Sequence, residues 1–82
     1  MLIIEVWRIE ESNCEKPSRV VAVVKGDISK KYEWDSYVST RKVLQEIMRD
    51  LNLKNHPKYV RLERWERHGL CHEWGFKLVY EV

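Results

Sequence analysis

The residue types that could bind a metal or carry out nucleophilic chemistry gather in one short stretch, His68-x-x-Cys71-His72. Structural zinc sites use four ligands, usually in two separated pairs, and this stretch supplies three. A thiolate at Cys71 beside either imidazole could act as a nucleophile. However, the chain has no glycine-rich phosphate loop and no nucleophile elbow to complete such a site. We therefore interpret the stretch as turn residues and expect no catalytic residue, no cofactor and no metal in a protein that is not an enzyme.

Cys14 and Cys71 are the two cysteines of the chain. Small secreted domains usually carry more, so these two do not form a disulfide framework. The first residues, Met1-Leu-Ile-Ile-Glu5, lack the basic region and apolar stretch of a signal peptide. No apolar run is long enough for a transmembrane helix. We expect a protein of the reducing cytoplasm with no membrane association.

Nucleic-acid binding is a second chemistry that the residue pattern allows. Tyr59, Arg61, Trp65 and Arg67 alternate along one segment, and Lys77 lies on the next. Aromatic and basic side chains on an open sheet are used by RNA-binding modules to stack unpaired bases. The net charge of +2 and the pI near 8.6 are modest for such a domain. Single-stranded RNA or DNA binding therefore stays as the alternative function.

The 82 residues form a single domain, 1–82, because the chain is too short for a second core. Apolar residues of both parities in 2–10 predict a strand buried on much of both faces. The β-branched run in 19–27 predicts a second strand. The segment 30–35 either continues that strand past a bulge at Gly26 or forms a separate short piece.

One helix is predicted over 39–51, where apolar residues recur at helical spacing. Ser36 or Ser39 can cap its start, and Asn52 can take the left-handed conformation that ends it. Alternation predicts a third strand over 59–67 and a fourth over 71–82, with a turn between them.

The fold class is therefore α+β: a ββαββ two-layer sandwich with one helix on one face of a four-stranded sheet. This element order resembles the β-grasp arrangement, in which the first and last strands lie parallel in the middle of the sheet. The resemblance implies that the two hairpin turns lie at opposite ends. Cys14 and Cys71 are then far apart, which argues against a disulfide and against a shared metal site. No functional residue is carried over from this resemblance.

The single predicted helix can cover only one face of the sheet, so the residues of the other face are left without a helix over them. Alternation assigns to the covered face, beneath the helix, Leu2, Ile4, Val6, Val20, Ala22, Val24, Val60, Leu62, Trp74, Phe76, Leu78 and Tyr80. The helix-free face then receives an unusually apolar set that an antiparallel sheet seldom leaves in water. Its members that we expect to bind a partner are Trp7, Ile9, Val21, Val23, Tyr59, Arg61 and Trp65. Aromatic residues and arginine are typical of interface hot spots. We expect a small intracellular interaction module that forms a homodimer or docks a protein partner through this face.

Overall fold

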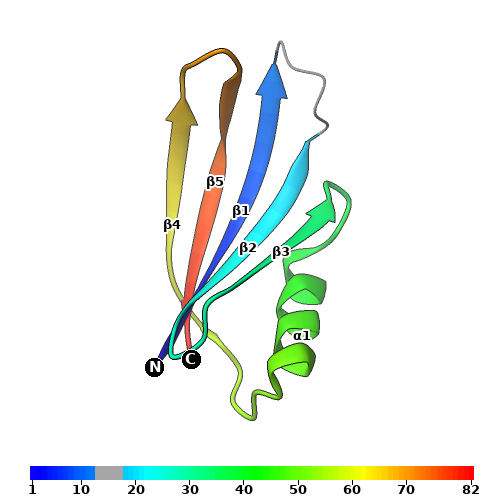
Figure 1. Cartoon of the computed structure of the whole chain (residues 1–82), viewed down its shortest axis with the longest axis vertical. Helices are drawn as coiled ribbons and strands as arrows, with labels where there is room; N and C mark the ends of the chain where they lie inside the picture. The colour runs from blue at the N-terminus through cyan, green and yellow to red at the C-terminus, as the bar shows by residue number, and fades with distance from the viewer. Residues whose placement is uncertain (13–17) are drawn as a thin grey trace.

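Five strands and one helix make up the fold, in a computed structural model that describes residues 1–12 and 18–82 (Figure 1). The elements are β1 (Leu2–Ser12), β2 (Arg19–Gly26), β3 (Lys30–Asp35), α1 (Thr40–Leu51), β4 (Lys58–Arg67) and β5 (His72–Glu81). The strands form one sheet in the order β3-β2-β1-β5-β4, and all neighbouring pairs are antiparallel. The α+β class with one helix is confirmed. The expected four-stranded ββαββ order is wrong, because residues 30–35 form a separate strand.

The extra strand also changes the relation between the first and last strands. Gly26 has a φ of 130° and ends β2, so the chain reverses there and β3 pairs with β2 in antiparallel register. Three strands rather than two then precede the helix, which reverses the direction of every later strand relative to a β-grasp fold. As a result β1 and β5 are antiparallel, with Ile3 opposite Glu81 and Ser12 opposite His72.

The antiparallel pairing overturns the argument about the cysteines. The far end of β1 and the turn between β4 and β5 lie at the same end of the sheet, at the top of Figure 1. Cys71 lies in that turn and is disulfide-bonded. The expectation that Cys71 takes no part in a disulfide is therefore wrong. Cys14 lies outside the described residues.

The helix begins and ends where its capping residues indicate. The Ser39 hydroxyl accepts a hydrogen bond from the Lys42 backbone N–H at 3.1 Å, and Asn52 takes φ 54° and ψ 47°. These contacts satisfy backbone groups that a helix leaves unpaired at its ends. The Arg8 guanidinium donates to the Val38 carbonyl and to the Thr40 hydroxyl, both at 3.0 Å, and so fastens β1 to the helix start. No helix among the described residues is long and apolar enough to span a membrane.

The hydrophobic core lies between the helix and the first two strands. Its buried members are Leu2, Ile4 and Val6 of β1, Val20, Ala22 and Val24 of β2, and Val43 and Ile47 of α1. Strand β3 is tied to the outer side of the helix, where the Tyr32 hydroxyl donates to Asp50 at 2.6 Å and the Trp34 indole donates to Glu46. Lys30 also pairs with Asp50, and the bonds from Lys30 and Tyr32 lower the pKa of that carboxyl. The helix thus belongs to the β1–β2–β3 half of the molecule.

Gly75 lies at a place where β5 leaves no room for a side chain next to β1. It lies opposite both Ile9 of β1 and Trp65 of β4, with a φ of 157°. A Cβ added there would lie 1.8 Å from the Arg8 carbonyl oxygen, which is far inside van der Waals contact. The backbone rather than a movable side chain is the obstacle, so the central ladder would have to shift.

We expect Gly75→Ala to lower the free energy of unfolding by about 2 kcal/mol or more, because it forces a steric clash onto a strained backbone position. Urea denaturation followed by Trp fluorescence measures this loss. Gly69→Ala is the matched control, since the nearest atom to its added Cβ is 4.0 Å away. Equal stability of the two variants would contradict the close approach of β5 to β1.

Candidate functional site

Five of the seven predicted partner-binding residues line one groove on the helix-free face. Trp7 and Ile9 of β1, Val21 and Val23 of β2, and Trp65 of β4 enclose a shallow space of about 430 Å³. Charged residues complete the lining: Glu5, Arg19, Lys25, Lys31, Glu33, Arg67 and Glu73. The sequence alternation therefore placed these five apolar side chains correctly on a common surface.

Two tryptophans form the apolar centre of this groove. The rings of Trp7 and Trp65 meet edge to face, with centroids 5.4 Å apart and an interplanar angle of 68°. Such contacts contribute about 0.5–1.5 kcal/mol beyond the burial of area. Lys77 places its ammonium 4.9 Å from the centroid of the Trp7 ring, which is cation–π distance.

The helix-free face is less exposed than its composition suggests. Ile9 and Val21 retain only 8% and 6% of their accessible surface, although no helix covers them. The indoles of Trp7 and Trp65 line the same groove as these two residues, and the Arg19 side chain reaches across this face to Glu73. The expectation of a broad apolar patch is thus wrong for Ile9 and Val21, because neighbouring side chains shelter them.

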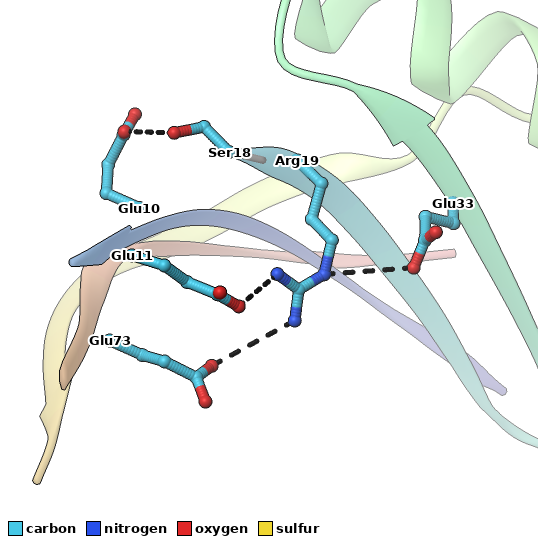
Figure 2. Close-up of polar contacts among 6 residues, drawn as sticks. All are labelled: Glu10, Glu11, Ser18, Arg19, Glu33 and Glu73. Atoms are coloured by element: carbon cyan, nitrogen blue, oxygen red, sulfur yellow. Dashed lines mark hydrogen bonds and ion pairs between the residues drawn. The ribbon is translucent and has the colours of Figure 1, made fainter. Parts of the chain in front are cut away.

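Arg19 is the centre of an ionic network that crosses this face (Figure 2). Its guanidinium pairs with Glu11 of β1, lies 3.8 Å from Glu33 of β3, and lies 4.0 Å from Glu73 of β5. One side chain of β2 therefore connects three other strands. The Glu11 side chain is only 2% exposed, and within residues 1–12 and 18–82 its Oε2 atom has no hydrogen-bond partner. Of the cations in those residues, Arg19 is the one paired with the buried Glu11 charge, and we expect it to compensate that charge.

A second ionic group occupies the other half of the face. Glu5 is 8% exposed and lies 3.2 Å from Lys25 and 3.6 Å from Lys77. Glu63 accepts from Arg61 at 3.1 Å and lies 3.2 Å from Lys77. Hydrogen bonds first from Lys77 and then from Arg61 lower the pKa of the Glu63 carboxyl. The basic groups on this half thus face acidic ones.

Tyr59 and Arg61, the remaining two predicted residues, lie outside the groove. The register of β4 shifts between them, and this bulge turns Tyr59 to the helix side of the sheet. There its ring meets that of Tyr80 at 5.9 Å, and Tyr80 packs against the core. The prediction that Tyr59 shares a face with Trp65 is therefore wrong. Arg61 stays on the helix-free side, opposite Val79 and beyond the groove.

An exposed apolar stripe on the helix side of β4 and β5 escaped the sequence interpretation. Leu62 is 50% exposed, Trp74 38% and Phe76 44%. We expected these residues beneath the helix, but a 12-residue helix is about 18 Å long, and it packs over β1, β2 and β3 instead. A signal was present in β4, whose polar residues Arg64 and Glu66 lie opposite Phe76 and Trp74.

Strand β4 lies at one edge of the sheet and has β5 as its single neighbour among the described strands. Eight of its ten residues are exposed, the exceptions being Glu63 and Trp65. Its side chains contribute to both surfaces described above, Trp65 to the groove and Leu62 to the stripe. The groove, the stripe and this free edge together form the candidate functional site.

Comparison with protein-family models, with curated proteins and with solved structures finds no match for this chain. What the molecule does must therefore be argued from its geometry. The groove and the ionic networks described above combine indoles, aliphatic groups and paired charges.

We expect Arg19→Met to lower the free energy of unfolding by about 2–4 kcal/mol, because it leaves the buried Glu11 carboxylate without its cation. Chemical denaturation at neutral pH measures the loss. Arg19→Met combined with Glu11→Gln should recover part of it, since the buried charge is then removed. Arg41→Met, on an exposed position of the helix, is the control. An Arg19→Met variant as stable as that control would contradict the role of the network.

The lowered pKa of Glu63 predicts a pH-dependent contribution to stability. A carboxyl whose pKa is lower in the folded than in the unfolded state stabilises the fold above its ordinary value of 4.5, and this contribution is lost as the pH falls through the folded pKa. The stability difference between the wild type and Glu63→Gln should therefore shrink between neutral pH and pH values below 4.5. Urea denaturation across this range is the measurement. A constant difference would contradict the ion pairs of Glu63.

Proposed function

We propose that this chain is a non-catalytic interaction module that forms a homodimer through the free edge of β4. A second copy of the chain pairs its own β4 with this edge in antiparallel register. The two five-stranded sheets then continue into one sheet of ten strands. This proposal keeps the self-association expected from the sequence but moves its centre from the helix-free face to the strand edge.

The first support is the open edge itself. An edge strand presents a row of unpaired backbone N–H and C=O groups, which another strand can pair with. Strand β4 has ten residues, contains no proline and is mostly exposed. The other edge, β3, is shorter, with six residues, and its side chains are tied to the helix. The β4 edge is thus the more open of the two.

The observation that carries the proposal is the charge pattern of residues 63–67, Glu-Arg-Trp-Glu-Arg. Two antiparallel copies with Trp65 on the two-fold axis place Glu63 opposite Arg67 of the second copy. They also place Arg64 opposite Glu66 of the second copy. Residues directly opposite in an antiparallel pair point to the same face, so four pairs of opposite charge form around one pair of tryptophans.

Neighbouring registers are disfavoured by the same charges. With Arg64 on the axis, two arginines face each other, and with Glu66 on the axis two glutamates do. Like charges directly opposite one another destabilise a strand pair. The segment therefore selects one register, and a two-fold axis closes the assembly at two copies.

The groove and the stripe lie beside the proposed seam, which is the line along which the two β4 strands pair. One lies on each face of the sheet. On the helix-free side, Trp65 at the axis continues into the groove through its contact with Trp7. On the helix side, the exposed Phe76 and Trp74 lie opposite Arg64 and Glu66, one strand away from the seam. Two copies would bring the two Trp65 side chains together across the axis on the helix-free side, which supports a dimer with aromatic residues at its centre. On the helix side, the pairs of Arg64 and Glu66 would lie between the Phe76 and Trp74 side chains of the two copies.

The alternative of single-stranded RNA or DNA binding has less support. Tyr59 lies on the opposite face from Trp65, so the proposed stacking platform is divided. Arg61 and Lys77 are both paired with Glu63, which weakens the attraction of this face for phosphate. A change in Trp fluorescence on titration with single-stranded RNA at low salt would favour the alternative.

We expect Arg64→Glu to raise the dissociation constant of the dimer about tenfold, because it turns two pairs of opposite charge into two like pairs. Arg64→Glu combined with Glu66→Arg should restore association, since the pairs are then reversed rather than broken. Light scattering coupled to size-exclusion chromatography over a concentration series measures the native mass. A chelator in the buffer excludes effects of divalent metal ions on the native mass. Arg41→Glu on the helix is the matched control.

Hydrogen exchange locates the interface independently. The backbone amides of residues 63–67 that point away from β5 should exchange more slowly at high than at low protein concentration, while the amides of β3 should not. A wild-type chain that stays monomeric at all accessible concentrations contradicts the proposal. So does a dimer whose stability is unaffected by Arg64→Glu.

A further inference from the structure

Three side chains with metal-binding groups converge at the end of the hairpin formed by β4 and β5. They are Glu66 of β4, His68 in the turn and His72 at the start of β5. We propose that these three residues form a binding site for a divalent transition-metal ion of the zinc type. The site lies within one chain, so this inference does not rest on the proposed dimer.

The geometry brings all three groups to one point. Their ligand atoms lie within 4.8 Å of one another. The Glu66 Oε1 atom contacts the Nε2 atom of His68 and lies 3.5 Å from the Nε2 atom of His72. The two imidazole rings are stacked, with centroids 4.5 Å apart and an interplanar angle of 18°. One carboxylate oxygen therefore faces two imidazole nitrogens from two different segments.

A second observation at the same place concerns His72. Its Nε2 atom is buried, and among the described residues it makes no hydrogen bond, since the Glu66 Oε1 atom at 3.5 Å is at ion-pair distance only. Buried polar atoms are nearly always satisfied, and leaving one unsatisfied costs about 1–3 kcal/mol. A metal ion bound between the imidazoles and the carboxylate would satisfy this nitrogen. The exposed position of His68 leaves its ring free to adjust to the shorter ligand distances of a bound ion.

The surroundings hold two of the three ligands in place. His72 lies opposite Ser12 of β1, and its ring packs 4.9 Å from that of Trp74. Glu66 is paired in the ladder with Trp74. Cys71, the residue before His72, is disulfide-bonded. A site on paired strands loses less conformational entropy on binding than one on a free loop.

The ligand chemistry indicates which ions the site would take. Two imidazole nitrogens and one carboxylate oxygen suit zinc, copper or nickel, whereas magnesium and calcium prefer oxygen ligands alone. The Cys71 sulfur belongs to a disulfide and so does not act as a thiolate ligand. Three protein ligands leave one position of a tetrahedral ion open. The side chains of Glu66 and His68 are 54% and 72% exposed, so water or a donor from another molecule can reach that position.

The sequence analysis weighed His68, Cys71 and His72 as a metal-binding fragment and expected no metal there. The interpretation of 68–72 considered Cys71, which the disulfide removes, and did not include Glu66. Glu66 and His68 are two residues apart on the same side of an extended chain. The hairpin turn then returns His72 to them, which local spacing alone does not indicate.

Calorimetric titration of the oxidised, tag-free protein with zinc chloride tests the proposal. We expect one zinc ion per chain and no comparable heat with magnesium chloride. His68→Ala and Glu66→Gln should each weaken zinc binding at least about tenfold. His56→Ala, an exposed histidine in the connection between α1 and β4, should leave it unchanged. Cobalt(II) should give the visible absorption bands of a tetrahedral ion, and His68→Ala should weaken them.

Zinc bound no more tightly than magnesium would overturn the proposal. It would also be overturned if His56→Ala reduced zinc binding as much as His68→Ala does. Far-UV circular dichroism verifies that each variant is folded, and the exposed position of His68 makes His68→Ala the decisive variant. The native mass is measured separately, so failure of the metal site and failure of the dimer give different results.

Discussion

The area that one short helix can shelter is the constraint on which the rest of this structure depends. The helix has 12 residues and packs its apolar side against β1 and β2, with β3 tied to its outer side. The sheet has five strands, so within the described part of the chain the helix leaves the β4–β5 side of this face uncovered. Leu62, Trp74 and Phe76 lie on that side and are exposed for this reason. Burial of apolar surface drives folding, and surface that a chain leaves uncovered is available for association.

The helix-free face also carries aliphatic residues, and α1 does not cover them. Ile9 and Val21 are buried in a groove that they share with two paired indoles and several ionic side chains. The Arg19 network connects four strands in this way (Figure 2). Its members belong to segments distant in sequence, and their pairing therefore depends on the complete sheet. A partly buried ionic cover of this kind stabilises the sheet and also limits how much of the face a partner could contact directly.

The order of the strands places β4 at one edge of the sheet and the Glu66, His68 and His72 cluster at one end of it. The connection through the helix carries the chain from β3 at one edge to β4 at the other (Figure 1). Strand β4 is thereby left open, and its hairpin with β5 gathers Glu66, His68 and His72. The edge and the cluster share Glu66, whose Oε1 atom faces both imidazoles. The second oxygen of this carboxylate can still accept a hydrogen bond from an arginine, so occupation of the cluster and pairing of the edge are compatible.

The sequence by itself determined the local features: the helix with a serine cap at Ser36 or Ser39 and its end at Asn52, the alternation of β5, and the common face of Trp7, Val21 and Trp65. Each depends on side-chain periodicity or on the conformation of single residues, which neighbouring residues specify. Tertiary structure decided the rest. The glycine after the β-branched run permits both a bulge and a chain reversal, and only pairing of β3 with β2 selects the reversal. That selection made the first and last strands antiparallel, placed the helix over one half of the sheet, and brought His72 back to Glu66. These outcomes depend on contacts between distant segments, for which local periodicity carries no information.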